Sequence, residues 1–225
     1  MAALIRLHNV SLKRGNKVIF DHLDFELGRG EFVYIIGASG AGKSSFLKLL
    51  YAETKPDEGE IHVGKFEISK LRKSEIPFLR RNLGIVFQEF RLLFDRNVYE
   101  NVAFVLEVTG VGSKDISRKV NEALSEVGLL SKKYDMPETL SGGEQQRVAI
   151  ARAIVREPYF LLADEPTGNL DPEVSTEIMQ LLKRISGKGV TTLVVTHDYD
   201  IVSRVPSRTL MIKSGKIFDV VLKGN

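Results

Sequence analysis

Hydrophobic and polar residues alternate in two early segments, residues 4–10 and 18–27, as expected for strands with one buried face. The run EFVYIIG at 31–37 is almost entirely apolar, which indicates a parallel strand that is buried on both faces. Further predicted strands span 59–63, 83–87, 159–164 and 190–196. The chain therefore contains enough strands for a sheet with a buried centre.

Apolar residues at helical spacing predict several helices, the first of them directly after the apolar run. Residues 97–156 are mainly helical, and Gly128 can end one of these helices. Residues 172–186 are predicted to form another helix, and Asp171 suits its N-cap. Strands and helices that alternate around a helical stretch, roughly 89–157, predict an α/β domain with a helical insertion.

Composition limits the class of protein. The chain has 225 residues, of which 43% are hydrophobic and 27% are charged, which is typical of one ordinary globular domain. No apolar stretch approaches the roughly 20 residues of a membrane-spanning helix, and we see no secretion signal. The absence of cysteine excludes disulfides and thiolate metal sites, and the net charge of +3 is too small to predict nucleic-acid binding.

The segment GASGAGKS matches the pattern G-x-x-x-x-G-K-[ST] and lies between a predicted strand and a predicted helix. The glycines let backbone N–H groups approach an anion closely. Lys43 can bring charge to the β- and γ-phosphates, and the Ser44 hydroxyl can bind Mg²⁺. The alternative is a simple glycine-rich turn. The residues expected to bind nucleotide here are Gly37, Ala38, Ser39, Gly40, Ala41, Gly42, Lys43, Ser44 and Ser45.

Two adjacent acids, Asp164 and Glu165, follow the apolar part of the predicted strand 159–164. Ligands of parallel α/β sheets lie at the carboxyl ends of the strands, so these side chains should share a crevice with the phosphate loop. Asp164 suits Mg²⁺ held through water, and Glu165 suits a general base for the attacking water. The alternative is a polar strand end before a turn. The two acids indicate a catalytic site only in combination with the phosphate loop.

The segment LSGGEQQR at 140–147 has two competing interpretations. Ser141 and Glu144 form a capping box, which marks a helix start. That interpretation leaves Gly142 and Gly143 unexplained, since a glycine in a helix costs up to about 1 kcal/mol relative to alanine. A helix N-terminus with a serine hydroxyl is also an anion site. We therefore expect Ser141 and Gly143 to contact the nucleotide held by a second copy of the chain.

Phosphate loop, LSGGEQQR and LLADE, in this order, resemble the motifs of ATPase subunits of ABC transporter-type systems. The resemblance implies an ABC ATPase fold, which is a P-loop NTPase (RecA-like) core with an antiparallel β subdomain and an inserted α-helical subdomain. It also implies one domain, 1–225, in which 1–88 and 158–225 form the core and β subdomain and 89–157 the helical subdomain.

The same resemblance implies roles for three more residues. Gln88 matches the Q-loop, which links Mg²⁺ and water to the helical subdomain; Asp171 matches the D-loop; His197 matches the switch histidine that contacts the γ-phosphate. The implied cofactors are ATP and Mg²⁺. The metal ligands would be Ser44, Gln88 and Asp164, and the catalytic residues Glu165, His197 and Gln88. The remaining histidines, His8, His22 and His62, are expected to be structural or exposed.

One position departs from the family. Its members usually stack an aromatic ring on adenine upstream of the phosphate loop, where this chain has Lys13 and Arg14. Arg14 can lay its guanidinium plane on the base. Phe20 is the alternative.

The stretch FQEFRLLFDRNVYENV at 87–102 is similar to that of the FtsE group of bacterial cell-division ATP-binding proteins. Its apolar residues have two interpretations: they form the core of the helical subdomain, or they line a groove that receives a cytoplasmic helix of a membrane partner. Some of these residues can fit the first interpretation and others the second. The residues are Phe90, Leu92, Leu93 and Phe94. The basic stretch 69–82 is expected to be a solvated face, with a position near anionic lipid as the alternative.

The FtsE-like resemblance implies an ATPase subunit that is cytoplasmic and peripheral on the inner face of the cell membrane. Its partners would be an FtsX-like integral membrane protein, a second copy of the chain when ATP binds, and other division proteins. The complex would control cell-wall hydrolysis during division. The alternatives are export of lipoprotein or drugs and, in another class, a soluble ATPase acting on DNA. The missing cysteines, missing heptads and slight charge argue against DNA, so we expect no nucleic-acid partner.

Overall fold

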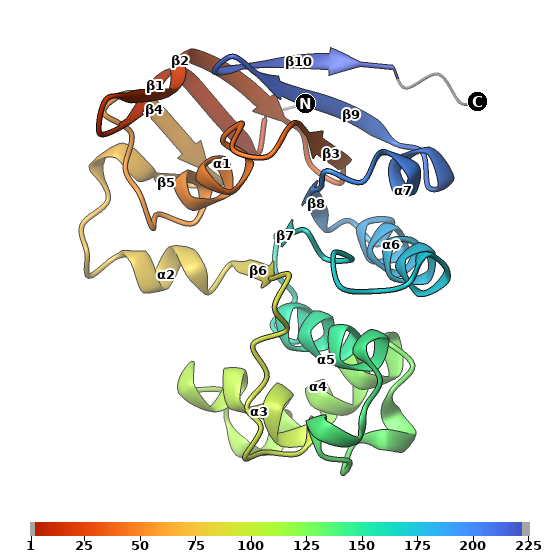
Figure 1. The fold of residues 1–225 in the computed structure, drawn as a ribbon. Helices are drawn as coiled ribbons and strands as arrows, with labels where there is room; N and C mark the ends of the chain where they lie inside the picture. Colours follow the sequence, from red (N-terminus) through yellow and green to blue (C-terminus); the bar gives the residue numbers. More distant parts are fainter. Residues whose placement is uncertain (1–2, 222–225) are drawn as a thin grey trace.

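The computed structural model describes residues 3–221, and within this range the strands form two sheets (Figure 1). The smaller sheet is antiparallel and has the order β2-β1-β4-β5. Its strands are β1 (Ile5–Arg14), β2 (Lys17–Leu27), β4 (Glu58–Val63) and β5 (Phe66–Glu67).

The larger sheet of the described chain has the order β10-β9-β3-β8-β7-β6. All its strands are parallel to their neighbours except β10, which pairs antiparallel with β9. They are β3 (Phe32–Ile36), β6 (Leu83–Val86), β7 (Phe160–Asp164), β8 (Thr191–Val195), β9 (Arg208–Lys213) and β10 (Lys216–Val220). Because β3, β6, β7 and β8 run the same way, the segments that follow them meet at one edge of the sheet.

The helices of residues 3–221 fall into three groups (Figure 1). In the first group, α1 (Lys43–Leu50) follows β3 and α2 (Ile76–Arg80) precedes β6. The second lies between β6 and β7: α3 (Val98–Val108), α4 (Ser113–Glu126) and α5 (Gly142–Ile154). The third follows β7: α6 (Pro172–Ser186) and α7 (Tyr199–Arg204). Short 3-10 turns span Ile68–Lys70, Leu130–Lys132 and Pro137–Thr139.

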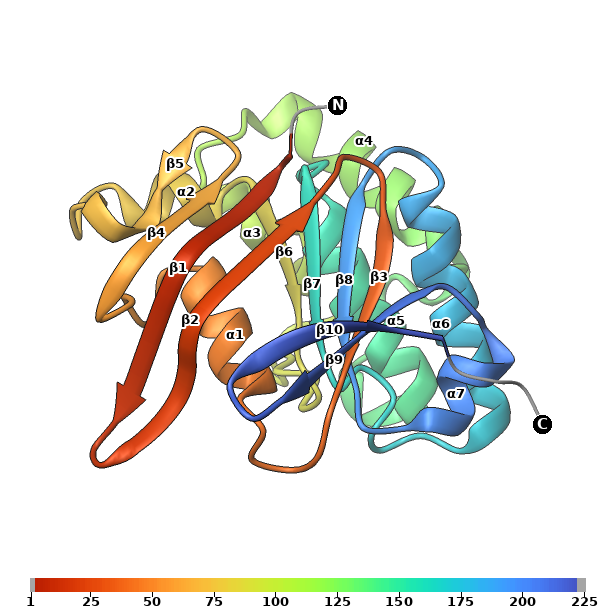
Figure 2. The ribbon, with the colours of Figure 1, turned by 90° about the horizontal axis from the view of Figure 1, so that it is seen from above.

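The larger sheet lies between two layers (Figure 2). On one face are α1 and the antiparallel sheet, and on the other are α5, α6 and α7. In β3, Tyr34 belongs to the core on the helical side, whereas Val33 and Ile35 belong to the core under α1. All three side chains are fully buried. This explains the continuous apolar run and confirms the prediction of a strand buried on both faces.

The inserted helices α3, α4 and α5 pack on one another below the sheet in Figure 1. A buried amide holds the segment that leads into α3: the Asn101 side chain accepts from the Leu93 N–H (2.8 Å) and donates to the carbonyls of Leu93 (2.9 Å) and Arg96 (2.9 Å). We propose 89–157 as the helical subdomain, because its helices lie between β6 and β7.

The structure agrees with the predicted order of strands and helices. The helix 172–186 coincides with α6, and Asp171 caps it as expected. Gly128 follows the end of α4 with a left-handed φ of 76°. We did not predict α2, α7, β5, β9 or β10. No helix within residues 3–221 combines the length and apolar character needed to cross a bilayer.

Candidate nucleotide site

The glycine-rich segment 37–42 connects the end of β3 to the start of α1. Gly42 precedes α1 with a left-handed φ of 109°, and within the described chain no side chain caps this helix. The first-turn N–H groups therefore remain available to an anion. A Cβ at Gly42 would lie 2.9 Å from Ile19 Cγ2, and a Cβ at Gly37 would lie 2.7 Å from the Ile212 carbonyl oxygen. Close packing thus requires glycine at both ends of the loop.

Lys43 is the first residue of α1 and is only 8% exposed. Its Nζ donates to the carbonyl oxygens of Gly37 (2.9 Å) and Ala38 (3.4 Å) and lies 3.7 Å from Glu165 Oε1. The ammonium group is therefore held between the loop and the end of β7. That is where a phosphate group bound by the loop would need a positive charge.

Two of the three residues expected to hold Mg²⁺ are in contact. Ser44 Oγ, in the first turn of α1, donates to Asp164 Oδ1 at the end of β7 (3.3 Å). Burial raises the pKa of the Asp164 carboxyl; the Ser44 hydrogen bond opposes this shift and the charge of Glu165 adds to it. Mg²⁺ prefers hard oxygen ligands such as a carboxylate and a hydroxyl, so these side chains fit the metal.

Glu165 follows β7 in a left-handed conformation (φ 49°), and its N–H donates to the Val195 carbonyl (2.9 Å). Its carboxylate is 14% exposed and is held from the end of β8. Oε1 lies 2.9 Å from His197 Nδ1, and Oε2 accepts from the His197 N–H (3.2 Å). A carboxylate with an adjacent orienting residue is the arrangement of a general base. His197, predicted to contact the γ-phosphate, contacts Glu165 in this structure.

Gln88 follows β6 and is exposed. A Cβ at Gly168 would lie 2.8 Å from Gln88 Nε2, so the glycine leaves room for the amide beside the loop after β7. Gln88 thereby joins the start of the helical insertion to the segment that carries Glu165.

Most of these residues line one cleft of about 470 Å³ at the carboxyl edge of the sheet; Asp164 does not line it but contacts Ser44, which does. The cleft is lined by Arg14, Ile19, Ser39, Gly40, Gly42, Lys43, Ser44, Ser45, Gln88, Glu165 and His197. All of these except Ile19 were predicted site residues. The other predicted loop residues, Gly37, Ala38 and Ala41, lie within the loop itself. Sequence reasoning missed Ile19, a buried residue of β2 whose Cγ2 packs close to Gly42 of the loop.

The two candidates for contact with adenine differ in exposure, and contact with Arg14 stays a prediction. Arg14 is exposed and lines the cleft. Phe20 is fully buried and packs edge-on against Phe46, with ring centroids 6.2 Å apart. The alternative based on Phe20 is therefore wrong, because this ring belongs to the core under α1.

The predicted capping box at the start of α5 is present. Glu144 N–H donates to Ser141 Oγ (3.3 Å), and Ser141 N–H donates to Glu144 Oε2 (3.0 Å). Ser141 and Asp171 are exposed. In the part of the chain that the structure describes, Ser141, Gly143 and Asp171 do not line the phosphate-loop cleft. One chain therefore does not bring the two predicted anion sites together.

Gly143 has a local explanation that the sequence argument did not foresee, and Gly142 has a weaker one. A Cβ at Gly143 would lie 2.5 Å from Val174 Cγ1, and a Cβ at Gly142 would lie 3.3 Å from Leu170 Cδ2. Gly143 is buried by this contact. Val174 belongs to the first turn of α6, which Asp171 caps through Oδ1 (3.0 Å to Val174 N), and Leu170 directly precedes that cap. Packing within the chain is therefore enough to account for Gly143, and contact with the nucleotide of a second copy stays a prediction.

Comparison with known proteins identifies the family. The sequence pattern that defines the family "ABC transporter" matches residues 20–168. The chain belongs to the ABC transporter family. A cell division ATP-binding protein FtsE from Mycobacterium tuberculosis is 50% identical over 205 residues, covering 91% of this chain and 89% of the relative. The Escherichia coli FtsE is 45% identical over 215 residues, covering 95% and 97%. The predicted resemblance to FtsE is confirmed.

Solved structures confirm the predicted ABC ATPase fold. A dimeric ATP-binding cassette in a post-hydrolysis state, bound to ADP and Pi, has a TM-score of 0.83 and 34% identity, covering 98% of this chain and 100% of that chain. The cbiO1 protein of Clostridium perfringens, part of the transporter complex cbiONQ, has a TM-score of 0.90 and 30% identity, covering 100% and 89%. The chain is thus an ATPase of the ABC type.

In this ABC ATPase, Gln146 makes a buried contact with the loop after β7 that sequence reasoning missed. Its side chain is fully buried in α5, and Nε2 donates to the Pro166 carbonyl (2.6 Å). It therefore ties the helix that begins at Ser141 to the loop directly after Glu165. The signal was present, since Gln146 belongs to LSGGEQQR, but its direction toward the core depends on the helix packing.

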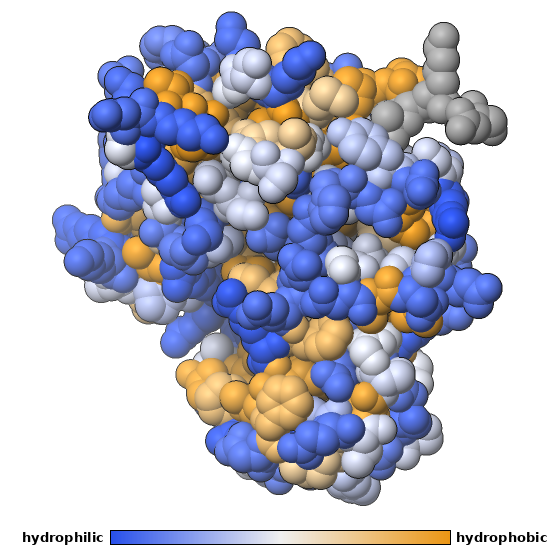
Figure 3. All heavy atoms as spheres, in the orientation of Figure 1, coloured by the Kyte–Doolittle hydropathy of each residue, from blue (hydrophilic) through white to orange (hydrophobic). Residues whose placement is uncertain are grey.

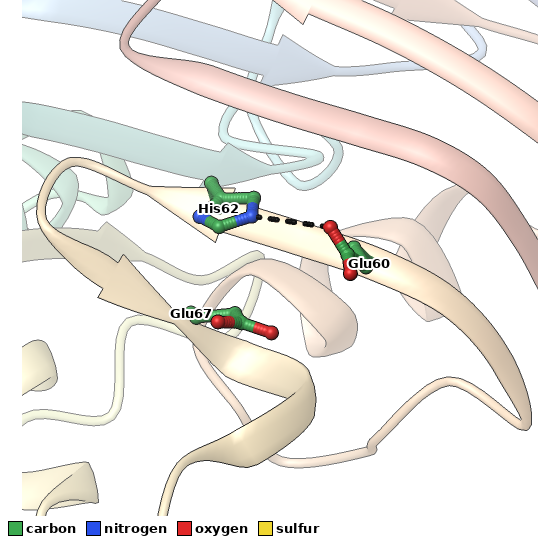
Figure 4. A group of neighbouring side chains, drawn as sticks. All are labelled: Glu60, His62 and Glu67. Atoms are coloured by element: carbon green, nitrogen blue, oxygen red, sulfur yellow. Dashed lines mark ion pairs between the residues drawn. The ribbon is translucent and has the colours of Figure 1, made fainter.

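A second cluster of ionisable side chains lies on the antiparallel sheet (Figure 4). His62 Nε2 is 3.7 Å from Glu60 Oε2, and Glu67 lies opposite His62 in the β4–β5 register. Lys70 Nζ is 2.8 Å from Glu67 Oε1 and already compensates that carboxylate. We therefore interpret this cluster as surface ion pairs of an ABC ATPase and assign no metal to it.

Proposed function

We propose that the chain is the ATP-hydrolysing subunit of an FtsE–FtsX-like complex, peripheral on the inner face of the cell membrane, which controls cell-wall hydrolysis during bacterial division. One observation supports the mechanism above all. The phosphate-loop cleft is assembled within one chain, whereas the helix start at Ser141 is exposed and lies outside it. Two copies that close head to tail would complete each site with the other's Ser141. A related cassette is solved as a dimer with ADP and Pi.

Within one chain, the backbone N–H groups of the phosphate loop and the Lys43 ammonium bind the phosphates of ATP. Arg14 stacks on the adenine ring from the other end of the cleft. Ser44, Asp164 and Gln88 hold Mg²⁺, which would neutralise phosphate charge when bound. The Ser44–Asp164 contact and the position of Gln88 in the same cleft support this assignment.

Glu165 accepts the proton of the attacking water, and His197 orients its carboxylate while contacting the γ-phosphate. The 2.9 Å contact between His197 Nδ1 and Glu165 Oε1 supports this pairing. Across the dimer, Ser141, Gly143 and Asp171 contact the nucleotide of the partner. Gly143 has no side chain and can do so only through its backbone N–H.

The substitution Ser141→Arg tests the dimer. The larger cationic side chain fills the space that the partner's nucleotide would occupy, so MgATP should no longer drive dimerisation in sedimentation velocity. Ser113→Arg is a matched control, since Ser113 is an exposed serine at the start of α4. Melting temperatures should match wild type for both. An ATP-dependent dimer that persists in Ser141→Arg would contradict the proposal.

A groove beside Gln88 supports a membrane partner. It has a volume of about 550 Å³ between α2, β6 and α3. Ile85, Phe87, Val105 and the 59% exposed Val108 form its apolar part. Its rim carries Arg80, Arg81, Arg91, Arg152 and Arg156. Among residues 3–221, none of these arginines lies within 4.0 Å of a carboxylate.

The basic rim is held in place by the chain itself. Arg91 lies 3.8 Å from the Phe87 ring centroid, and Arg152 donates to the carbonyls of Arg91 (2.6 Å) and Phe90 (2.8 Å). An apolar helix that carries acidic side chains would fit such a groove. We propose that this helix belongs to the cytoplasmic part of the FtsX-like partner.

In the FRLL segment beside this groove, some residues fit the interpretation as subdomain core and others fit the interpretation as a docking surface. Leu92 is 7% exposed and belongs to the core, whereas Phe94 is 51% exposed. Apolar side chains gather on the surface over α3 and the segment before it (Figure 3).

Co-purification with the membrane protein of the neighbouring reading frame tests this partner. Arg81→Glu should abolish co-purification, because it reverses a charge on the rim, while the ATPase rate of the isolated chain stays unchanged. Arg72→Glu is the matched control in the same basic stretch, since Arg72 lies outside the groove. Intact binding in Arg81→Glu would contradict the site, and co-purification of an exporter's membrane subunit would favour lipoprotein or drug export.

A further inference from the structure

The start of α5 carries a negative charge close to the proposed position of the ATP that the second copy binds. Glu144 is the third residue of this helix. The ion pair with Lys132 and the hydrogen bond from the Ser141 N–H lower the pKa of its carboxyl, so it is ionised at neutral pH. A bare carboxylate would repel a triphosphate, since like charges disfavour one another at short range.

Lys132 neutralises this carboxylate from a different element. It ends the 3-10 turn Leu130–Lys132, and its Nζ lies 2.6 Å from Glu144 Oε1. The other carboxylate oxygen, Oε2, accepts from the Ser141 N–H (3.0 Å). Each oxygen of Glu144 thus has its own partner.

Lys132 has no substitute in the described chain. Within residues 3–221, no other cationic side chain lies within 4.0 Å of the Glu144 carboxylate. Arg147 is paired with Glu177 (2.8 Å), and Lys133 lies over the Tyr134 ring (4.8 Å to the centroid).

We propose that Lys132 neutralises Glu144 so that the start of α5 attracts the ATP bound by the second copy. This inference rests on the proposed contact across the dimer. A helix N-terminus is equivalent to about half a positive charge. One full negative charge on Glu144 therefore outweighs the helix, whereas the Lys132–Glu144 pair leaves the positive end of the helix in excess. Asp171, at the neighbouring start of α6, is present in every variant and does not alter this comparison.

Sedimentation velocity with Mg²⁺ and a slowly hydrolysed ATP analogue tests the proposal. Lys132→Gln should weaken dimerisation by about tenfold, as expected for one uncompensated charge near an anion. The double variant Lys132→Gln/Glu144→Gln should restore dimerisation, because no charge remains to be neutralised. Glutamine at position 144 keeps the capping box, since its carbonyl can accept from the Ser141 N–H.

Two controls separate charge neutralisation from other effects. Lys132→Arg keeps the cation and should dimerise like wild type. Lys133→Gln removes the same charge from the next residue, which does not contact Glu144, and should also dimerise like wild type. The affinity of the monomer for the analogue should not change in Lys132→Gln, because Lys132 does not line the cleft.

The proposal is overturned if Lys132→Gln dimerises normally, or if the double variant stays as weak as Lys132→Gln, since Lys132 would then act directly on the nucleotide. Glu144→Gln alone retains the lysine and should dimerise at least as well as wild type; weaker dimerisation would also overturn it. Ser141→Arg separates this inference from the proposed function. If Ser141→Arg blocks the dimer and Lys132→Gln does not matter, only the role of Lys132 is wrong.

Discussion

The carboxyl edge of the larger sheet and the start of α5 differ in how their polar groups find partners. At the sheet edge, groups from separate strand ends meet: Lys43 lies near Glu165, Ser44 donates to Asp164, and His197 contacts Glu165. At the start of α5, Ser141 and Glu144 bond to each other within one turn. Parallel strands collect distant residues at one edge, whereas a helix start collects only its neighbours.

This difference indicates which region works alone. The cleft already combines a phosphate loop, the buried cation of Lys43 and the carboxylate of Glu165, so we expect it to bind MgATP in a single chain. The helix start offers an exposed hydroxyl and a helix dipole, which suit an anion brought from outside. Substitutions that affect one region and leave the other intact test the two roles separately.

The largest effect should come from Glu165→Gln, which removes the proposed base from the cleft. We expect ATP hydrolysis to fall by about 10² to 10⁴, the usual contribution of general-base catalysis, while ATP affinity is kept. Phosphate release at saturating ATP measures the rate. Glu138→Gln, at an exposed glutamate outside the cleft, is the control. Normal turnover in Glu165→Gln would remove this residue from the mechanism.

The next largest effect should be on binding. Lys43→Ala removes a buried cation, and the phosphates would lose a charged partner in a partly desolvated site. We expect the ATP affinity to fall by about 10² to 10³ in isothermal titration calorimetry. Lys48→Ala, on the same helix but paired with Glu53 (2.8 Å), should bind like wild type. Unchanged affinity in Lys43→Ala would be fatal to the phosphate-loop assignment.

The sequence predicted the cleft well because its residues follow strands with strong apolar runs. Asp164 and Glu165 could be placed beside the phosphate loop because ligands of parallel sheets lie at the carboxyl ends of the strands, and α6 could be bounded from its N-cap. We did not predict the hairpin of β9 and β10. In its turn, Ser214 and Gly215 both adopt left-handed φ (51° and 75°), as a tight hairpin turn requires. Its Ile212 carbonyl then packs against Gly37.

Contacts between distant elements could not be predicted in the same way. Gly143 looked like a place for a ligand because helix propensity says only that glycine is costly there. The contact with Val174 depends on how α5 packs on α6, which one sequence does not specify. The choice between Arg14 and Phe20 likewise depends on which face of β2 meets α1.

A smaller effect should show whether these glycines serve the chain itself. Gly143→Ala should destabilise the nucleotide-free monomer by about 1 to 3 kcal/mol in urea unfolding, because the new methyl group would overlap Val174. Gly142→Ala should be close to neutral, since its neighbour is farther away and alanine favours the helix. Adding Val174→Ala should rescue Gly143→Ala. Full stability of Gly143→Ala would instead favour a role reserved for the partner's nucleotide.

The smallest effect concerns the stability of the empty cleft. Because burial raises the pKa of the Asp164 carboxyl, the folded chain disfavours its ionised form, and stability is lost as the pH rises through that pKa. Asp164→Asn should therefore stabilise the nucleotide-free chain at neutral pH by less than about 1 kcal/mol, since the carboxylate is partly exposed. The gain should disappear as the pH falls and the wild-type carboxyl becomes protonated.

Thermal unfolding of both proteins between pH 4 and 8, roughly the range over which a carboxyl with a raised pKa titrates, measures this difference. The same substitution should remove Mg²⁺-dependent binding of ATP. A chain that gains stability and loses the metal would show that Asp164 is placed for its ligand at a cost to the fold. If Asp164→Asn is less stable than wild type at neutral pH, the Ser44–Asp164 hydrogen bond stabilises the fold by more than the burial of charge destabilises it. Contacts such as Ser44–Asp164 would then stabilise the nucleotide-free cleft, and ATP binding would have to break them.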